Sequence, residues 1–245
     1  DYEAWVAERL GTADERVVAL PLAELVGQRF DDLNVLILRR CATDPECTTA
    51  HECNLPGIPD DQFAQPASGP VLLTHADVRA VALSRFRDLP PGPIWDIGAG
   101  LGGVAVELAR ALRAREVVAV ERSCEQRNYL VQNRKRFGAY NMRIVAGEAP
   151  EALAQEELPA AVFLGGSGGR LEAILDLLLE MIDPNGCLVA HFVVLENLSL
   201  CLSRLRSASW IAETTLVQVA HSQPLAGLSA LLPERPVWVV KGRRA

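Results

Sequence analysis

The feature that most constrains this fold is a cluster of glycines between a short apolar segment and a helical one. Residues 94–97 are apolar except for Asp96, and four glycines fall within residues 98–103 in a G-x-G-x-x-G spacing. Glycines at this density let the backbone turn sharply and let a ligand approach the N-terminus of the following helix. The spacing predicts a ligand-binding turn between a strand and a helix, rather than a tight turn alone.

Strands and helices alternate on both sides of this turn. The predicted strands are 94–97, 116–121, 142–146, 160–164, 188–194, 211–220 and 237–240. The predicted helices are 75–86, 102–112, 124–137, 149–153, 171–182 and 196–208. Continuous apolar strands separated by helices predict a doubly wound parallel sheet covered on both faces. Only a loop with Pro, Gly and Leu separates the last two strands, so we expect them to run antiparallel, as an edge feature.

The first 70 residues follow a different pattern. We expect helices over 1–10 and 22–27 and a strand over the apolar run 33–38. Five prolines and a polar cluster in 39–70 predict a linker or covering loop. At 245 residues the chain is long for one domain and short for two, so we expect domain boundaries at 1–38, 39–70 and 71–245. The chain begins with Asp1, and we expect it to be part of a longer protein.

Charge and hydropathy exclude several classes of protein. There are 24 Lys and Arg against 31 Asp and Glu, which gives a net charge of −7. A broadly basic nucleic-acid platform is therefore excluded, although a local basic patch is not. The sequence has no apolar run of the ~18–20 residues that span a bilayer and no secretory signal, so we expect a cytoplasmic protein.

The cysteines do not indicate a metal centre. Cys41, Cys47 and Cys53 surround His51 in the turn-rich stretch, but their C-x5-C-x3-H-x-C spacing matches no common structural zinc pattern. We therefore predict a variable loop there and no metal site, and an assay for bound zinc tests this. The remaining cysteines lie in apolar periodic segments and are expected to be small core residues.

The carboxylates near the glycine turn bear on the kind of ligand. Asp96 precedes the glycines, Glu121 ends the next strand, and Glu148 follows the third. Acids at the ends of three successive strands suit S-adenosylmethionine, which has a cationic amino group and no phosphate, better than a dinucleotide. Asp96 and Glu148 have an alternative interpretation as turn and helix caps. Taken together, the three acids favour the methyl donor.

Several motifs in 71–240 resemble the decarboxylating C15-methyltransferase family of the cobalamin pathway, a branch of the class I S-adenosylmethionine methyltransferases. They are Leu73-Thr74 before Val78-Arg79, Trp95–Gly100, Ala119–Glu121, Gly147–Leu153, Val162–Gly169 and Pro224–Gly227. Phe163–Gly169, with the sequence FLGGSGG, is the most specific of these. The resemblance implies a Rossmann-like, mostly parallel seven-stranded sheet with an antiparallel last strand, and a homotetramer.

Residues 1–63 resemble the C-terminal end of the partner C5-methyltransferase, a tetrapyrrole methylase often fused ahead of such a domain. The likeness rests on Gly11–Arg16, Asp31–Leu38 and Leu55–Phe63. It implies that 1–38 is the remnant of a C5-methyltransferase domain. The full-length protein would then be a bifunctional precorrin-6Y-type enzyme.

The resemblance also implies a set of site residues. The cofactor would be S-adenosylmethionine, with S-adenosylhomocysteine as product, held by Thr74, Asp96, Gly98, Ala99, Gly100, Leu101, Gly102, Glu121, Glu148 and Ala149. The tetrapyrrole would lie against Gly165, Gly166, Ser167 and Gly168, where small residues let a broad macrocycle approach the backbone. Alternatives are an ordinary helix cap for Thr74 and a flexible loop for the second glycine run.

Two departures from the family concern the substrate. His191 stands where relatives usually have asparagine; it is the candidate for a catalytic role and for a contact with the substrate or the cofactor, and a satisfied buried histidine is the alternative. The late loop 221–224 lacks the basic residues that relatives often carry for a polycarboxylate. Arg79, Arg170 or another subunit would have to supply the charge. The residue that removes the ring C carboxylate is not assigned.

The favoured function is methylation of C15 of a precorrin-6B-type tetrapyrrole with decarboxylation of its ring C acetate. Whether that substrate carries cobalt stays open. The alternatives are a class I methyltransferase acting on RNA or another small molecule, and a non-catalytic S-adenosylmethionine-binding module. The negative net charge and the absence of an RNA module argue against RNA.

Overall fold

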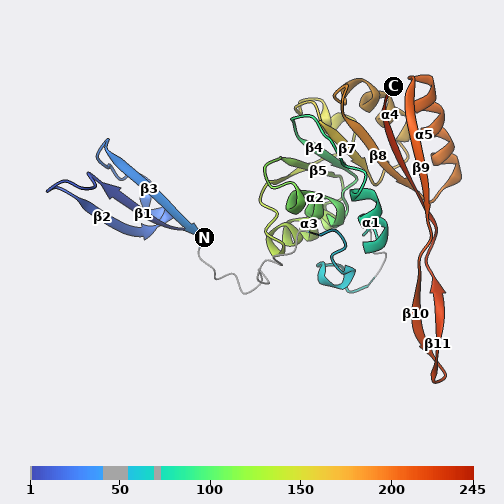
Figure 1. The fold of residues 1–245 in the computed structure, drawn as a ribbon, viewed down its shortest axis with the longest axis horizontal. Helices are drawn as coiled ribbons and strands as arrows, with labels where there is room; N and C mark the ends of the chain where they lie inside the picture. The colour runs from blue at the N-terminus through green and yellow to red at the C-terminus, as the bar shows by residue number, and fades with distance from the viewer. Residues whose placement is uncertain (1, 41–54, 69–72) are drawn as a thin grey trace. The chain divides into compact units, whose positions relative to one another are not determined.

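The structure is a computed structural model that describes residues 2–40, 55–68 and 73–245, with the side chain of residue 40 left out. The chain forms two compact units, Asp1–Thr48 and Thr49–Ala245. We call them the N-terminal and the C-terminal unit and describe each by itself (Figure 1). In the described residues, no helix is long and apolar enough to cross a membrane.

The N-terminal unit contains a three-stranded antiparallel sheet with the order β2-β1-β3. Its strands are β1 Tyr2–Glu8, β2 Arg16–Pro21 and β3 Asn34–Arg40, and a 3-10 turn covers Leu22–Leu25. The helix predicted over 1–10 is therefore wrong. Its alanines and glutamates favour a helix locally, but β1 pairs with a strand on each side and buries Ala4, Val6 and Ala7. Tertiary pairing has overridden local propensity.

A seven-stranded sheet with the order β6-β5-β4-β7-β8-β12-β9 forms the centre of the C-terminal unit. Its strands are β4 Ile94–Ile97, β5 Val117–Glu121, β6 Met142–Ala146, β7 Ala161–Leu164, β8 Cys187–Phe192, β9 Trp210–Val217 and β12 Val237–Arg244. β4 to β8 pair in parallel, and β12 runs antiparallel to both β8 and β9. The expected antiparallel last strand is confirmed, but it lies inside the sheet, and β9 is the edge.

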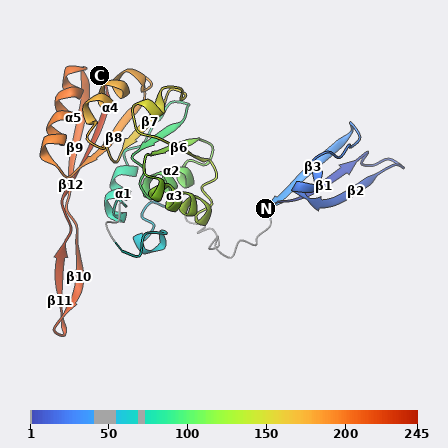
Figure 2. The ribbon, with the colours of Figure 1, turned by 180° about the vertical axis from the view of Figure 1, so that it is seen from behind.

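Helices cover both faces of this sheet, as predicted (Figures 1 and 2). They are α1 Ala76–Leu83, α2 Gly103–Ala111, α3 Cys124–Arg136, α4 Leu171–Met181 and α5 Leu195–Ser207, with 3-10 turns at Asp60–Gln62 and Glu151–Leu153. One core holds α1, α2 and α3, and the other holds α4 and α5. Alternate residues of each central strand enter opposite cores: Ala161 and Phe163 the first, Val162 and Leu164 the second.

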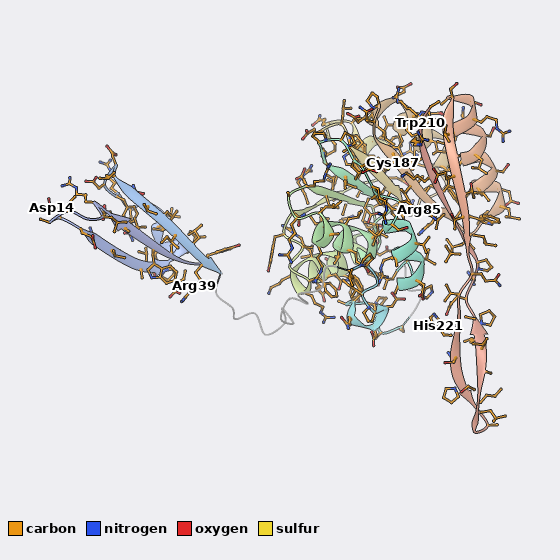
Figure 3. All side chains as sticks on the ribbon, viewed as in Figure 1. Asp14, Arg39, Arg85, Cys187, Trp210 and His221 are labelled. Carbon is orange, nitrogen blue, oxygen red and sulfur yellow. The ribbon has the colours of Figure 1, made fainter. Side chains whose placement is uncertain are left out.

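A two-stranded hairpin stands between β9 and β12, where the sequence predicted only a loop. It consists of β10 Ala220–Leu225 and β11 Leu228–Pro233 and projects away from the sheet (Figure 1). Leu225 pairs with Leu228, and Ala226 and Gly227 both have positive φ, which is the geometry of a type I′ turn. The loop prediction was wrong because this segment lacks polar and apolar alternation: nearly all of its side chains, such as that of His221, are exposed (Figure 3).

Residues 55–68 pack onto the C-terminal unit as a covering segment. Ile58 and Phe63 are buried in the core that holds α1, α2 and α3. Asn133 of α3 binds the backbone of Ala64 through both its oxygen and its nitrogen. These residues have almost no regular structure of their own, so side chains of the helices satisfy their backbone groups.

Candidate functional site

A cavity of about 660 Å³ opens at the carboxyl ends of the central strands, and residues from β4, β5, β7 and β8 line it. After β4, the chain adds β5 and β6 on one side of that strand and then β7 and β8 on its other side. The cavity lies at this change of direction, which is the position at which open α/β sheets bind ligands. Its size suits a small molecule or a cofactor. The predicted residues that line it are Thr74, Asp96, Gly98, Ala99, Gly100, Glu121, Glu148, Ala149, Gly165, Gly166, Ser167, Gly168 and His191.

The glycine turn is held by the strand beside it. The backbone N–H groups of Gly98 and Ala99 both donate to the carbonyl of Val120, at 3.0 Å each. The N–H of Gly100 donates to Oε2 of Glu121 at 2.9 Å. These hydrogen bonds hold the turn against β5. Gly103 and Val104, the first residues of α2, line the cavity, so the N-terminal N–H groups of this helix lie close to it.

The two glycine runs of the sequence meet in space. A Cβ atom on Gly98 would lie 2.6 Å from the carbonyl oxygen of Gly166, so only a glycine fits there. The N–H groups of Gly165 and Gly166 both donate to the carbonyl of Ile97. The segment predicted to hold the cofactor and the segment predicted to hold the substrate thus form one continuous wall.

Asp96 is buried on the wall of this cavity. Among the described residues, neither of its carboxylate oxygens has a hydrogen-bond partner. Burial is the main cause that raises the pKa of Asp96, to about 7; the nearby backbone N–H of Ala105 opposes the shift and Glu121 adds to it. A buried carboxylate without a partner is costly, so this arrangement is suited to a cationic ligand.

Glu121 and Glu148 have different environments. Glu121 is buried, and each of its oxygens accepts one backbone hydrogen bond, from Ser123 at 2.7 Å and from Gly100 at 2.9 Å. Each oxygen keeps a second acceptor site for ligand hydroxyl groups. Glu148 is partly exposed and accepts a hydrogen bond from Arg122 at 2.8 Å.

His191 lies at the end of β8 beside the second glycine run. Its Nε2 lies 2.9 Å from the carbonyl oxygen of Gly165, and its ring stands edge-on to Phe163. Burial lowers the pKa of His191, against the opposing effect of the Gly165 carbonyl. The neutral ring therefore donates from Nε2, which leaves Nδ1 as an acceptor that has no partner in the described part of the chain.

Thr74 is held at the cavity by a buried network. The cap residue of α1 is His75, so the alternative interpretation of Thr74 as the helix cap is wrong. Its carbonyl instead accepts a hydrogen bond from the fully buried guanidinium of Arg79. Arg79 also binds the carboxylates of Glu107 at 2.8 Å and Asp60 at 2.7 Å.

Two predicted cofactor residues do not line the cavity. Leu101 is buried in the interior, and its carbonyl accepts a hydrogen bond from Asn133 at 2.9 Å. Gly102 has a φ of +88°, and a Cβ atom there would lie 2.2 Å from the side chain of Leu130. These two residues therefore support the glycine turn on its interior side, where they contact α3.

The two arginines considered as sources of positive charge are both paired elsewhere. Arg79 is buried with Glu107 and Asp60 and does not line the cavity. Arg170 forms two hydrogen bonds with Glu151. Neither arginine supplies free positive charge at the cavity. Cys41, Cys47, His51 and Cys53 lie outside the described residues, and among the described residues no group of three or more His, Cys, Asp and Glu side chains could hold a metal ion.

Sequence reasoning missed the part of the cavity that comes from the C-terminal end of the chain. Glu234, Arg235 and Val237 line the cavity, together with His75. His75 lies 3.0 Å from Asp60 and 3.6 Å from Glu234. No motif marks these residues: the hairpin returns Glu234, Arg235 and Val237 to the site from a distant part of the chain, and His75 directly precedes α1.

Comparisons with known proteins identify the family of this chain. Residues 68–242 match a family model described as precorrin methyltransferase domain. Cobalt-precorrin-6B C(15)-methyltransferase (decarboxylating) of Salmonella typhimurium is 34% identical over 182 residues, which are 74% of this chain and 93% of the relative. The crystal structure of precorrin-6Y C5,15-methyltransferase from Geobacter metallireducens superposes with a TM-score of 0.72 at 31% identity, over 78% of this chain and 97% of the other.

A third relative extends into the N-terminal unit. Precorrin-6Y C(5,15)-methyltransferase [decarboxylating] of a Sinorhizobium species is 28% identical over 232 residues. The match covers 95% of this chain but only 54% of the relative. A match over 95% of this chain has to include most of the N-terminal unit, and the chain spans about half the length of that relative.

Proposed function

This chain belongs to the precorrin methyltransferase family, and on that premise we propose that it methylates C15 of a precorrin-6B-type tetrapyrrole and decarboxylates its ring C acetate. The observation that carries the proposal is the contact between the two glycine runs. Because Gly98 packs against Gly166, a donor bound at the first run and a macrocycle bound at the second share one cavity. Methyl transfer requires this proximity.

S-adenosylmethionine is the proposed methyl donor, and when bound it supplies an electrophilic methyl group on a sulfonium. The residues fit this cofactor, because the buried and unpartnered oxygens of Asp96 would accept from its ammonium group. Glu121 would accept from the ribose hydroxyls through its remaining acceptor sites. The residues proposed to hold the cofactor are Thr74, Asp96, Gly98, Ala99, Gly100, Glu121, Glu148 and Ala149, with Leu101 and Gly102 shaping the turn behind it.

The proposed macrocycle site is the wall formed by Gly165, Gly166, Ser167, Gly168 and His191. A planar ring system can approach this backbone closely because most of these residues have no side chain. His191 is neutral, and its Nδ1 is an acceptor that a ring N–H group of the substrate would satisfy after a small adjustment of the wall. We give His191 a positioning role and assign no residue to the decarboxylation.

Two features of assembly belong to the proposal. We propose a homotetramer, supported by the exposed hairpin, whose Leu225, Leu228, Leu231 and Leu232 are each more than half exposed. Apolar side chains gathered on an exposed hairpin are typical of a surface that another copy covers. We also propose that the N-terminal unit is the end of a fused C5-methyltransferase domain, supported by the match to the Sinorhizobium relative.

Two experiments test the proposal. Calorimetry with S-adenosylhomocysteine measures binding to the wild type and to the Gly100→Arg variant, which we expect to lose it because Gly100 lies on the cavity wall with a φ of +58°. Circular dichroism establishes whether that variant folds. Incubation with S-adenosylmethionine and a precorrin-6B-type substrate, with and without cobalt, is then followed by mass spectrometry.

The expected product has gained one methyl group and lost one carbon dioxide. The C–C bond to the carboxyl group breaks, its electron pair stays with the macrocycle, and a proton replaces the carboxyl group. Cofactor binding with no change in substrate mass would contradict the proposed reaction and would favour another substrate or a non-catalytic module.

A further inference from the structure

The wall of the cavity carries more negative than positive side chains. Asp96, Glu121, Glu148 and Glu234 line it, whereas its arginines are Arg122 and Arg235. A substrate with several carboxylates would be repelled by this wall unless a cation were free to meet it. A residue that selects an anionic substrate therefore has to be one of the cations that line the cavity, with no carboxylate partner of its own.

Arg122 and Arg235 differ in their partners. Arg122 binds Glu148 at 2.8 Å and is already neutralised. Arg235 has an exposed side chain, and the described residues provide it with no ion-pair or hydrogen-bond partner. Of the two, Arg235 keeps its charge available to a ligand.

The backbone around Arg235 is held in place although its side chain is free. The N–H of Glu234 donates to the carbonyl of Val219 at 2.9 Å, and the Glu234 carboxylate lies 3.6 Å from Nε2 of His75. Pro236 follows, which restricts Arg235 to an extended conformation. Val237 then begins β12. A free guanidinium on a fixed backbone is suited to select a ligand group at one position.

We propose that Arg235 binds a carboxylate on a peripheral arm of the tetrapyrrole and so selects an anionic substrate. This inference rests on the function proposed above, and Arg235 is the basic group that this function requires. The planar guanidinium presents two parallel N–H donors that match the two oxygens of a carboxylate. The contact lies at an arm and not at the reacting carbon, so Arg235 determines specificity and takes no part in the chemistry.

The experiment compares Arg235→Gln, Arg235→Lys and the control Arg243→Gln on the full chain. Arg243 is also exposed and has no ion-pair or hydrogen-bond partner among the described residues, but it lies near the other end of β12, away from the cavity. Steady-state kinetics with the precorrin-6B-type substrate measures KM and kcat, and calorimetry with S-adenosylhomocysteine measures cofactor affinity. A substrate with single carboxylates converted to methyl esters is the second probe.

For Arg235→Gln we expect KM to rise about tenfold to a hundredfold, as for a lost hydrogen bond to a charged group, with kcat and cofactor affinity unchanged. Arg235→Lys should recover part of the loss, because it keeps the charge without the paired donors. One of the monoesters should be insensitive to Arg235→Gln. Arg243→Gln should resemble the wild type.

Three outcomes would overturn the inference: a wild-type KM in Arg235→Gln, an equal rise in Arg243→Gln, or full sensitivity of every monoester. Failure of the proposed function looks different. In that case the wild type itself would bind S-adenosylhomocysteine without converting the substrate, and the inference, which rests on that function, would fall with it.

Discussion

Gly98 and Gly166 pack backbone against backbone, close enough that a Cβ atom on Gly98 would meet the carbonyl oxygen of Gly166 at 2.6 Å. α2, β5, α3 and β6 separate the two residues along the chain, yet parallel pairing of β4 with β7 places them side by side. The contact explains why position 98 needs glycine, whereas a Cβ atom on Gly166 would lie at an ordinary 3.8 Å from the Cα atom of Gly98.

We predict that Gly98→Ala destabilises the protein by about 2–4 kcal/mol and abolishes S-adenosylhomocysteine binding, because it adds overpacking to an unfavourable positive φ. The matched control is Gly138→Ala. Gly138 also has a positive φ, but its nearest neighbour would lie at an ordinary 3.6 Å, so about 1 kcal/mol is expected. Urea unfolding and calorimetry measure the two effects. Equal losses in the two variants would show that the contact with Gly166 is not tight.

The buried position of Asp96 predicts that stability depends on pH in a particular direction. In the unfolded chain this group has a pKa near ~3.9, and in the folded protein burial raises the pKa to about 7. The folded state therefore keeps a proton that the unfolded state releases. The stability of the ligand-free protein is expected to fall as pH rises from about 4 to about 7, by up to ~1.4 kcal/mol per pH unit.

Asp96→Asn should remove this slope and stabilise the ligand-free protein most at about pH 8, while S-adenosylhomocysteine binding is lost. Urea unfolding at a series of pH values checks the slope, and calorimetry checks the binding. Glu157→Gln, an exposed carboxyl on a loop, is the control that should leave both unchanged. If Asp96→Asn binds S-adenosylhomocysteine with wild-type affinity, Asp96 does not hold the cofactor.

The network around Arg79 predicts a large effect on stability. Arg79→Leu is expected to cost about 3–5 kcal/mol, because it leaves the Glu107 carboxylate buried without its charged partner. The exposed pair of Arg204 and Glu172 gives the comparison, and Arg204→Leu should cost less than about 1 kcal/mol. Urea unfolding measures both. The double variant Arg79→Leu/Glu107→Leu should lose less than the sum of its single variants, and simple additivity would exclude the coupling.

The hairpin β10–β11 predicts a test of assembly. Leu228→Asp/Leu231→Asp should convert a tetramer to smaller species, because two exposed leucines are replaced by charges. Ser229→Asp adds a charge on the same strand without removing an apolar side chain and should leave the assembly intact. Light scattering coupled to gel filtration reports the mass. A tetramer that survives the double change would place the interface elsewhere.

The sequence predicted the central sheet because its signals there are strong and local. The bounds of β4 and β6 match the prediction, since apolar residues end sharply at turn residues on both sides. It did not predict β1, whose strand conformation depends on two neighbours distant in the chain. It also did not predict the hairpin, which has no buried face to impose a pattern.

The sequence likewise predicts some residues of the candidate site and not others. Asp96 and Glu121 follow strands directly, so their place at the cavity could be inferred from strand ends alone. Arg79 was misread as a source of charge for the substrate, because its partners Asp60 and Glu107 lie 19 and 28 residues away along the chain. Arg235 belongs to no recognised motif and lies far along the chain from the other site residues. The sequence alone therefore did not place it at the cavity.

Residues 55–68 pack into the core of the methyltransferase domain, although nearly all of them lie before the start of the family match. The family match starts at residue 68, yet Ile58 and Phe63 fill the core, and Glu107 accepts the N–H groups of Gly57 and Ile58. A chain cut at residue 68 would expose apolar core and leave the Arg79 and Glu107 groups partly unsatisfied. A fragment that keeps this core therefore has to begin before Gly57, about a dozen residues ahead of the start of the family match.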